Sequence, residues 1–354
     1  MTTLWDPVRL GHRVLGNRLV QAPMTRSRAQ DDGTPGEWAP VYYAQRASMG
    51  LLITEGTQPS ADGQGYANTP GLHEAAHVAG WRRVVEAVHA AGGRVFIQLM
   101  HAGRMSHPDN TLHHRQALAP SAVAANVRIP TASGMRDVPV PRAMTSADIV
   151  RTIEDFAAAA ERAVEAGADG VELHGANGYL VQQFLAPNAN VRTDAYGGSI
   201  ENRARFAFEV AAAVADRIGA ARTGLRLSPG SALGGIDEGP ERADLYHHLV
   251  TQLAPLELAY LHVVQGRDEA LLREIRRLWP GVLIVNRPGR DRQSLSADLD
   301  AGLADMVSVG RMALSNPDLP TRIREDLPLN EPDPATFYGG GEAGYTDYPV
   351  FQPA

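Results

Sequence analysis

The chain has 354 residues, of which 44% are hydrophobic and 21% charged, so it can bury a large core and is not expected to be disordered. Its net charge of -7 argues against binding to nucleic acid or to an anionic membrane through a global basic field. Because the chain has no cysteine, disulfides, thiolate catalysis, iron–sulfur clusters and cysteine-ligated zinc are excluded.

The chain shows no targeting or membrane segment. No apolar run reaches the roughly 18 residues of a membrane span, and residues 1–17 lack an apolar stretch of signal-peptide length. We therefore expect a soluble, cytoplasmic protein that does not bind membranes. The sequence gives no indication of an oligomeric state.

Eight apolar segments that are typical of buried strands alternate with helical patterns. The segments are 18–24, 49–57, 94–101, 170–175, 224–229, 259–265, 282–286 and 305–310. Helices are expected between them at 81–91, with Trp81, Val84, Val85 and Val88 on one face, at 146–165 after an N-cap at Ser146, at 200–218 and at 268–278. Strands that are apolar on both faces and separated by helices predict a parallel sheet, and eight such units favour a closed (β/α)₈ barrel over an open sheet.

We expect a single barrel domain over residues 1–354, because no repeat or domain boundary interrupts this pattern. Two segments fall outside it. The first is an excursion at about 102–144, rich in His, Pro, Ser and Asn, whose histidines lack the spacing of metal ligands, so no metal site is expected. The second begins at about residue 328 and is interpreted as a strap over the barrel mouth, with a mobile tail as the alternative.

Polar residues follow the fourth predicted strand, at the end where such barrels place their active sites. His174 and Asn177 can each donate a hydrogen bond to one carbonyl oxygen and so stabilise the negative charge that develops there. Tyr179 adds a hydroxyl group that could deliver a proton. The alternative is that His174 and Asn177 cap the helix that follows.

Gly310 and Arg311 follow the eighth predicted strand and precede a predicted helix start at 316–318. A glycine lets the backbone approach a phosphate closely, and an arginine together with helix-start N–H groups would hold it. The alternative is an ordinary surface loop with a solvated arginine.

Two longer motifs and several shorter ones occur in a fixed order. The longer ones are H-G-A-N-G-Y-L-V-Q-Q-F-L at 174–185 and D-A-Y-G-G-S-I-E-N-R-A-R-F at 194–206, and the shorter ones run from N-R-L-V-Q-A-P-M-T-R-S-R-A at 17–29 to G-Y-T-D-Y-P at 344–349. Together they resemble the Old Yellow Enzyme family of NADH:flavin oxidoreductases and ene-reductases. Threonine at position 25 and the lack of cysteine place the resemblance in the yeast- and plant-like branch of that family.

The resemblance implies a non-covalent FMN at the C-terminal mouth of the barrel, with NADPH or NADH as reductant. Thr25 matches the threonine that hydrogen-bonds the flavin ring and tunes its potential, while Gln98 and Arg226 match residues that contact its pyrimidine side. The implied cofactor-binding residues are Pro23, Met24, Thr25, Gly56, Gln98, Arg226, Gly289, Gly310 and Arg311. Gly289 is the best match in the turn at 286–290, whose register stays open.

The implied reaction is the reduction of an activated alkene, such as an enal, enone, maleimide or nitroalkene. NAD(P)H gives a hydride to flavin N5 and leaves, and the alkene then takes that hydride at its β-carbon in the same pocket, which predicts ping-pong kinetics. His174 and Asn177 match the pair that binds the substrate oxygen, and Tyr179 matches the proton donor to the α-carbon. Tyr338 matches an aromatic residue that the strap brings to the site.

One residue departs from the family pattern. Met100 stands where many relatives have tryptophan, which predicts a roomier or reshaped substrate pocket and leaves substrate range and stereoselectivity open. The sequence indicates neither the physiological substrate nor a preference between NADPH and NADH.

Two alternative functions remain. One is a flavin barrel dehydrogenase that acts on another substrate class, and the other is a flavin-binding redox sensor with incidental turnover. The full set of His174, Asn177 and Tyr179 disfavours the sensor, because a binding protein does not need a proton donor. An aldolase would need a Schiff-base lysine or a metal, and the predicted strand ends supply no lysine.

Overall fold

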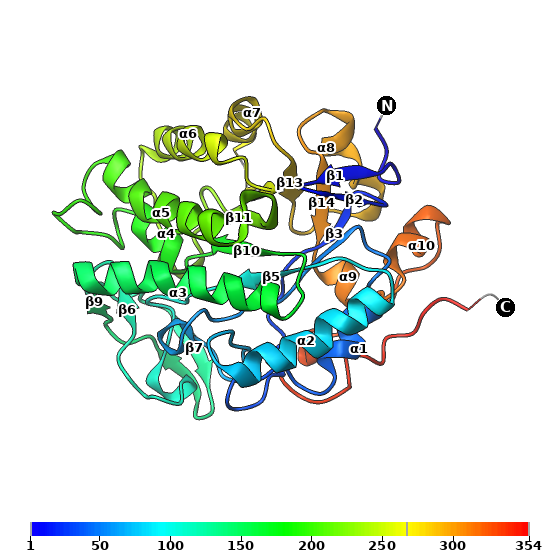
Figure 1. Ribbon diagram of the computed structural model, residues 1–354, viewed down its shortest axis with the longest axis horizontal. Helices are drawn as coiled ribbons and strands as arrows, with labels where there is room; N and C mark the ends of the chain where they lie inside the picture. The colour runs from blue at the N-terminus through cyan, green and yellow to red at the C-terminus, as the bar shows by residue number, and fades with distance from the viewer. Residues whose placement is uncertain (1, 267, 353–354) are drawn as a thin grey trace.

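Eight parallel strands close into a barrel in the computed structural model, which describes residues 2–266 and 268–352 (Figure 1). The strands are β3 (Leu19–Gln21), β4 (Leu51–Ile53), β5 (Val95–Leu99), β10 (Gly170–Gly175), β11 (Thr223–Leu227), β12 (Tyr260–Val264), β13 (Leu283–Asn286) and β14 (Met306–Val309). Val307 of β14 pairs with Leu19 of β3, which closes the ring. The predicted (β/α)₈ barrel is confirmed, and each strand overlaps the segment predicted for it.

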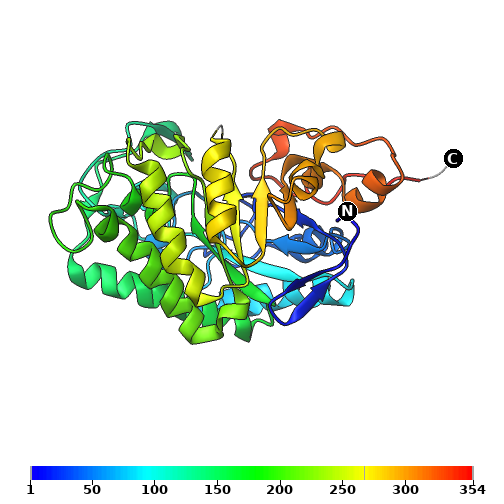
Figure 2. The same cartoon turned by 90° about the horizontal axis from the view of Figure 1, so that it is seen from above.

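Helices cover the outside of the barrel in both views (Figures 1 and 2). They are α1 (Ala39–Ala44), α2 (Ala75–Ala90), α3 (Ser146–Glu165), α4 (Leu180–Leu185), α5 (Ile200–Ile218), α6 (Arg242–Leu253), α7 (Glu269–Leu278), α8 (Ala297–Asp300), α9 (Arg311–Ser315) and α10 (Leu319–Arg324). In the described part of the chain, no helix combines the length and the apolar character needed to cross a membrane.

Two helix starts differ from the prediction. Helix α2 begins at Ala75 rather than Trp81, because His77 Nδ1 accepts the backbone N–H of Glu74 at 3.2 Å and so satisfies a donor at the new helix end. The N-cap predicted at Ser146 is wrong. Thr145 caps α3 instead, since its Oγ1 accepts the Asp148 N–H at 3.1 Å while the Asp148 carboxylate accepts the Thr145 N–H at 2.8 Å.

Short strand pairs lie outside the barrel. The antiparallel hairpin β1 (Val8–Leu10) and β2 (Arg13–Leu15) precedes β3, and residues 102–144 contain β6 (Leu118–Ala119), β7 (Arg128–Thr131), β8 (Gly134–Asp137) and β9 (Arg142–Ala143). Strands of two to four residues are too short to show a period of apolar residues, so the sequence of this segment predicts a loop. Nowhere in the described residues do three His, Asp or Glu side chains gather as a metal site.

The lower half of the barrel interior, which lies toward the N-terminal ends of the strands, is apolar. Phe96 and Tyr260 face each other there with ring centroids 5.6 Å apart. Gly170 and Gly224 make room for them, because a Cβ would lie 2.5 Å from the ring of Phe96 or 2.3 Å from that of Tyr260. The cluster also contains Val8, Leu10, Leu15, Val20, Leu51, Ile53, Ile284 and Met306. Residues of the β1–β2 hairpin therefore fill the N-terminal end of the barrel, and only the opposite end is left for a site.

Candidate active site

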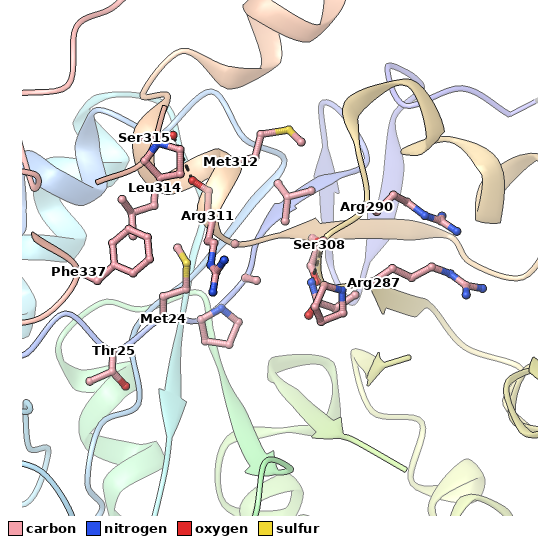
Figure 3. A pocket seen from close by; sticks show the side chains of 18 of the residues that line it. Met24, Thr25, Arg287, Arg290, Ser308, Arg311, Met312, Leu314, Ser315 and Phe337 are labelled. Carbon is pink, nitrogen blue, oxygen red and sulfur yellow. Dashed lines mark hydrogen bonds between the residues drawn. The ribbon is translucent and has the colours of Figure 1, made fainter. Parts of the chain in front are cut away.

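A cavity of about 810 Å³ lies at the C-terminal ends of the barrel strands, which is within the size range of small-molecule sites. Its walls come from residues at or just after the ends of several strands and from residues 329–338 of the C-terminal segment (Figure 3). The predicted residues that line it are Pro23, Met24, Thr25, Gln98, Met100, His174, Asn177, Tyr179, Arg226, Gly289, Gly310, Arg311 and Tyr338. Gly56 does not line it, but lies behind Met100, whose Sδ would be 2.6 Å from a Cβ at position 56.

His174 and Asn177 face the cavity rather than capping a helix. Helix α4 begins at Leu180 after Tyr179, and no side chain caps it. Asn177 has a φ of +56°, a left-handed conformation that asparagine tolerates better than most residues, and its N–H donates to Ser228 Oγ at 2.8 Å. The helix-cap alternative is therefore excluded, and both side chains remain free to serve the cavity.

The chemistry of this wall depends on which groups carry protons. Burial lowers the pKa of His174 well below its usual value, and the charge of Arg226 adds to that effect, so the imidazole is neutral near neutral pH. Burial raises the pKa of Tyr179 well above 10, and Tyr66 contributes to the shift. The Tyr179 hydroxyl donates to the Tyr66 hydroxyl at 3.3 Å. The site thus holds a neutral histidine and a protonated tyrosine, both able to donate.

Two cavity-lining residues, Arg226 in the floor and His174 in the wall, have buried nitrogen atoms that lack partners within the described part of the chain. Arg226 Nη2 donates to Asn286 Oδ1 at 3.2 Å, but Arg226 Nε and His174 Nδ1 are buried and have no hydrogen-bond partner among the described residues. Such groups are costly to bury unless a ligand completes their hydrogen bonds. A flavin ring, with carbonyl oxygens and ring nitrogens along one edge, offers matching acceptors. The residues present therefore fit FMN at this position.

The opposite side of the cavity has the features of an anion site. Gly310 is close to Met24, whose Sδ would lie 3.1 Å from a Cβ at position 310, so a larger residue would crowd the wall. Arg287 and Arg290 pair with Asp298 and extend away from Arg311 (Figure 3). Arg311 makes no salt bridge within the residues that the structure describes. Its charge is therefore available to a phosphate.

The turn at 286–290 contains one glycine with a left-handed backbone. Gly289 has a φ of +82°, which most other residues would adopt only with strain, and it lines the cavity. This conformation supports Gly289 as the glycine of the turn.

The C-terminal segment is tied across the cavity by residues that follow β3. Arg26 is fully buried and donates through Nε to the Phe337 carbonyl at 2.9 Å and through Nη2 to the Gly344 carbonyl at 2.8 Å. Tyr345 stacks on Tyr42 of α1 with ring centroids 4.2 Å apart, and Figure 1 shows this red segment beside α1. These contacts hold Tyr338 at the cavity rim, where 68% of it is exposed.

Several residues of the site were not singled out from the sequence. They include Tyr66, which contacts Tyr179, and the cavity-lining residues Asn286, Ser308 and Phe337. Asn286 and Ser308 are polar residues at or near the ends of apolar strands, a signal that could have identified them. Tyr66 and Phe337 lie in irregular segments, where no periodicity points to a site.

Comparisons with known proteins agree with this geometry. Residues 3–330 match the model of the NADH:flavin oxidoreductase / NADH oxidase family. The chain is 43% identical over 353 residues to a protein of Leishmania infantum described as a probable flavin mononucleotide-dependent alkene reductase, with 97% of this chain and 96% of that protein covered.

Two solved structures are also similar to this chain over almost its whole length. Morphinone reductase in complex with tetrahydroNAD is 44% identical with a TM-score of 0.95, covering 99% of this chain and 98% of that one. The old yellow enzyme homologue of Zymomonas mobilis is 38% identical with a TM-score of 0.95, covering 99% of this chain and 100% of that one. The chain therefore belongs to the NADH:flavin oxidoreductase / NADH oxidase family, the Old Yellow Enzyme family, and is an oxidoreductase, as the sequence predicted.

Proposed function

We propose that this protein is an FMN-dependent ene-reductase that uses NADPH or NADH to reduce the C=C bond of an activated alkene. The observation that carries the proposal is the meeting of three donors, His174, Asn177 and Tyr179, on one wall of a cavity whose floor holds Arg226. FMN, when bound, would supply the chemistry by carrying a hydride between the nicotinamide and the alkene. The names of the relatives, an alkene reductase and morphinone reductase, agree with this class.

His174 and Asn177 would bind the carbonyl or nitro oxygen of the substrate. Two hydrogen bonds to that oxygen withdraw electrons from the conjugated alkene and stabilise the charge that develops when a hydride arrives at the β-carbon. Tyr179 would then give its proton to the α-carbon. Its raised pKa keeps the hydroxyl protonated near neutral pH, and Tyr66 lies within 3.3 Å to donate to the oxygen that has lost its proton.

Thr25, Gln98 and Arg226 would contact the flavin ring, with Pro23 and Met24 beside it, while Gly289, Gly310 and Arg311 would hold the phosphate. The threonine at position 25, together with the lack of cysteine, would place the chain in the yeast- and plant-like branch. Gly56 would act indirectly, by giving Met100 room at the cavity wall. Met100 and Tyr338 would shape the alkene pocket, and the whole chain would form one barrel domain, with the segment from about residue 328 as its strap.

The proposal is tested by the visible spectrum of the purified protein during two anaerobic additions. Flavin bands should bleach when NADPH or NADH is added and return when 2-cyclohexenone follows. Bands that bleach but do not return with any enone, maleimide or nitroalkene would reject the substrate class and favour another flavin dehydrogenase or a redox sensor. A protein that gains no flavin bands on incubation with FMN would refute the proposal as a whole.

A further inference from the structure

A layer of polar side chains lies inside the barrel, between the cavity and the apolar lower half. It consists of Gln98, Glu172, Arg226, His262 and Ser308, which we call the polar layer, and each of these residues is at most 5% exposed. Gln98, Arg226 and Ser308 also line the cavity, whereas Glu172 and His262 do not. Burying an ionisable pair such as Glu172 and His262 costs free energy of folding unless the pair is fully hydrogen-bonded, so its presence calls for a physical reason.

Glu172 is the centre of this layer. Its Oε1 accepts from Gln98 Nε2 at 2.8 Å, its Oε2 pairs with His262 Nδ1 at 2.8 Å, and His262 Nε2 lies 2.7 Å from Ser308 Oγ. Although burial alone would raise the pKa of Glu172, the hydrogen bond from His262 and the positive charge of Arg226 hold it below the usual value, so the carboxylate is ionised. Burial lowers the pKa of His262, so its ring is neutral. An ionised carboxylate only accepts, so Nδ1 of His262 carries the proton and Nε2 accepts from Ser308.

The same rule fixes the direction of the Gln98 side chain. Because Glu172 can only accept, Gln98 must turn its NH₂ group to the carboxylate, which leaves its Oε1 without a partner among the described residues. Gln98 therefore presents an acceptor to the cavity. The imide N–H of a flavin pyrimidine ring is a donor that an acceptor in this place would bind.

Glu172 also changes the charge that the cavity presents. Burial lowers the pKa of Arg226 while the negative charge of Glu172 raises it, and the guanidinium stays protonated. The polar layer thus contains one positive and one negative charge, so that Glu172 offsets part of the field that Arg226 exerts on a ligand. FMN, when bound, would gain one negative charge on taking up a hydride, that is two electrons and one proton, and Arg226 would stabilise that charge.

We propose that Glu172 is a positioning residue for the flavin: it sets the Gln98 amide with its oxygen toward the cavity and, by opposing Arg226, lowers the affinity for reduced relative to oxidised FMN. This inference rests on the proposed function, because it requires FMN in the cavity. It assigns to a carboxylate outside the cavity a control over the reduction potential of the flavin.

The test compares FMN affinity and the two-electron reduction potential, measured anaerobically against a reference dye, in wild type and Glu172→Gln. The amide of the variant can still accept from Gln98, and His262 can take its other tautomer, accepting at Nδ1 and donating to Ser308 from Nε2. The shape of the layer is then kept while its negative charge is lost. We expect the ratio of affinities for reduced and oxidised FMN to rise about tenfold, which corresponds to a potential about 30 mV more positive.

Glu238→Gln is the matched control, because Glu238 is also buried but its partners Gln182, Gly230 and Tyr246 do not line the cavity. Its potential should stay at the wild-type value. If Glu172→Gln binds FMN with an unchanged or more negative potential, or if both variants shift alike, the inference is overturned. Wild type that binds no FMN would instead defeat the proposed function, which keeps the two failures distinct.

Glu172→Asp tests the position of the carboxylate separately from its charge. It is the deciding variant if Glu172→Gln does not fold. Aspartate keeps the charge but is one methylene shorter, so it cannot reach both Gln98 and His262 as glutamate does. We expect the affinity for FMN to fall about tenfold, the effect of losing roughly one hydrogen bond, with little change in potential. An unchanged affinity together with a shifted potential would overturn the assigned role.

Discussion

Arg26 provides a direct test of how the C-terminal segment, residues 328–352, which we call the strap, is held beside the cavity that it lines. Replacing it with methionine keeps an unbranched side chain that reaches about as far as Nε, but removes the guanidinium with its charge and donors. Three hydrogen bonds would be lost, to the carbonyls of Phe337 at 2.9 Å, Gly344 at 2.8 Å and Thr336 at 3.3 Å. Hydrogen bonds from a charged donor contribute about 1.5–3 kcal/mol each. The loss is not additive, because carbonyls of an opened strap regain water.

We therefore expect the free energy of local strap opening to fall by about 3 kcal/mol in Arg26→Met. Exchange of amide hydrogens in residues 334–345 should then be faster by about two orders of magnitude. The assay is hydrogen exchange followed by mass spectrometry, with peptides from α3 as an internal control that should not change. KM for the alkene should rise, because Tyr338 at the cavity rim is carried by the same segment.

Arg28→Met is the matched control for this prediction. Arg28 also donates to the strap, to the carbonyls of Gly341 at 2.9 Å, Ala343 at 3.0 Å and Thr336 at 3.0 Å, but it is only half-buried, so water can replace these bonds. Its loss should cost less than about 1 kcal/mol. If Arg28→Met loosens the strap as much as Arg26→Met, or if neither changes exchange there, the reasoning from burial is refuted.

Three further predictions follow from the site and from α3. Tyr179→Phe should slow reoxidation of the reduced enzyme by an enone by about 10²-fold or more while leaving reduction by NADPH unchanged in stopped-flow traces. Reoxidation of the variant at the wild-type rate would argue against Tyr179 as proton donor. Met100→Trp should narrow the range of enones accepted and alter product stereochemistry on chiral chromatography, because Met100 is 2% exposed and lines the cavity; an unchanged profile would contradict a reshaped pocket. Asp148→Asn should lower the free energy of unfolding by about 1–2 kcal/mol near neutral pH, because Arg142 and Arg151 hold the pKa of Asp148 far below its usual value. A lowered pKa gives stability that is present above the unfolded pKa and lost as the pH falls toward the folded pKa, so the free energies of unfolding of wild type and variant should begin to converge as the pH falls below about 4.

The barrel could be predicted because its strands are continuous apolar runs separated by helical periods. The strand at 170–175 and the helix at 200–218 have the predicted bounds, since Gly170 and Gly175 end an apolar run and Ser199 caps the helix. The start of α2 was misplaced because residues 75–80 lack a clear apolar period, while a side-chain contact of His77 determines where the helix begins.

The wall that carries His174, Asn177 and Tyr179 could be named from one segment of sequence, but the polar layer beneath the cavity could not. Glu172, Gln98 and His262 come from three different strands, and their contact depends on the register of the closed sheet, which places Glu172 opposite Gln98. Because these strands are buried on both faces, their local sequence pattern does not specify which residues of neighbouring strands lie opposite each other. The anchoring of the strap by Arg26 is likewise hidden, since its partner Gly344 lies 318 residues away.

The closure of the barrel also bears on when the protein can take up a ligand during its synthesis. The pairing of Leu19 with Val307 completes the ring, and the contact between Arg26 and Gly344 completes the mouth. Both join early residues to late ones, and contacts of such high sequence separation form slowly. A chain that is still being translated therefore has neither a closed ring of strands nor an anchored strap until residue 344 has left the ribosome. A ligand could therefore be enclosed only after both contacts have formed, and until then the barrel strands at the two ends of the sheet stay unpaired and exposed to aggregation.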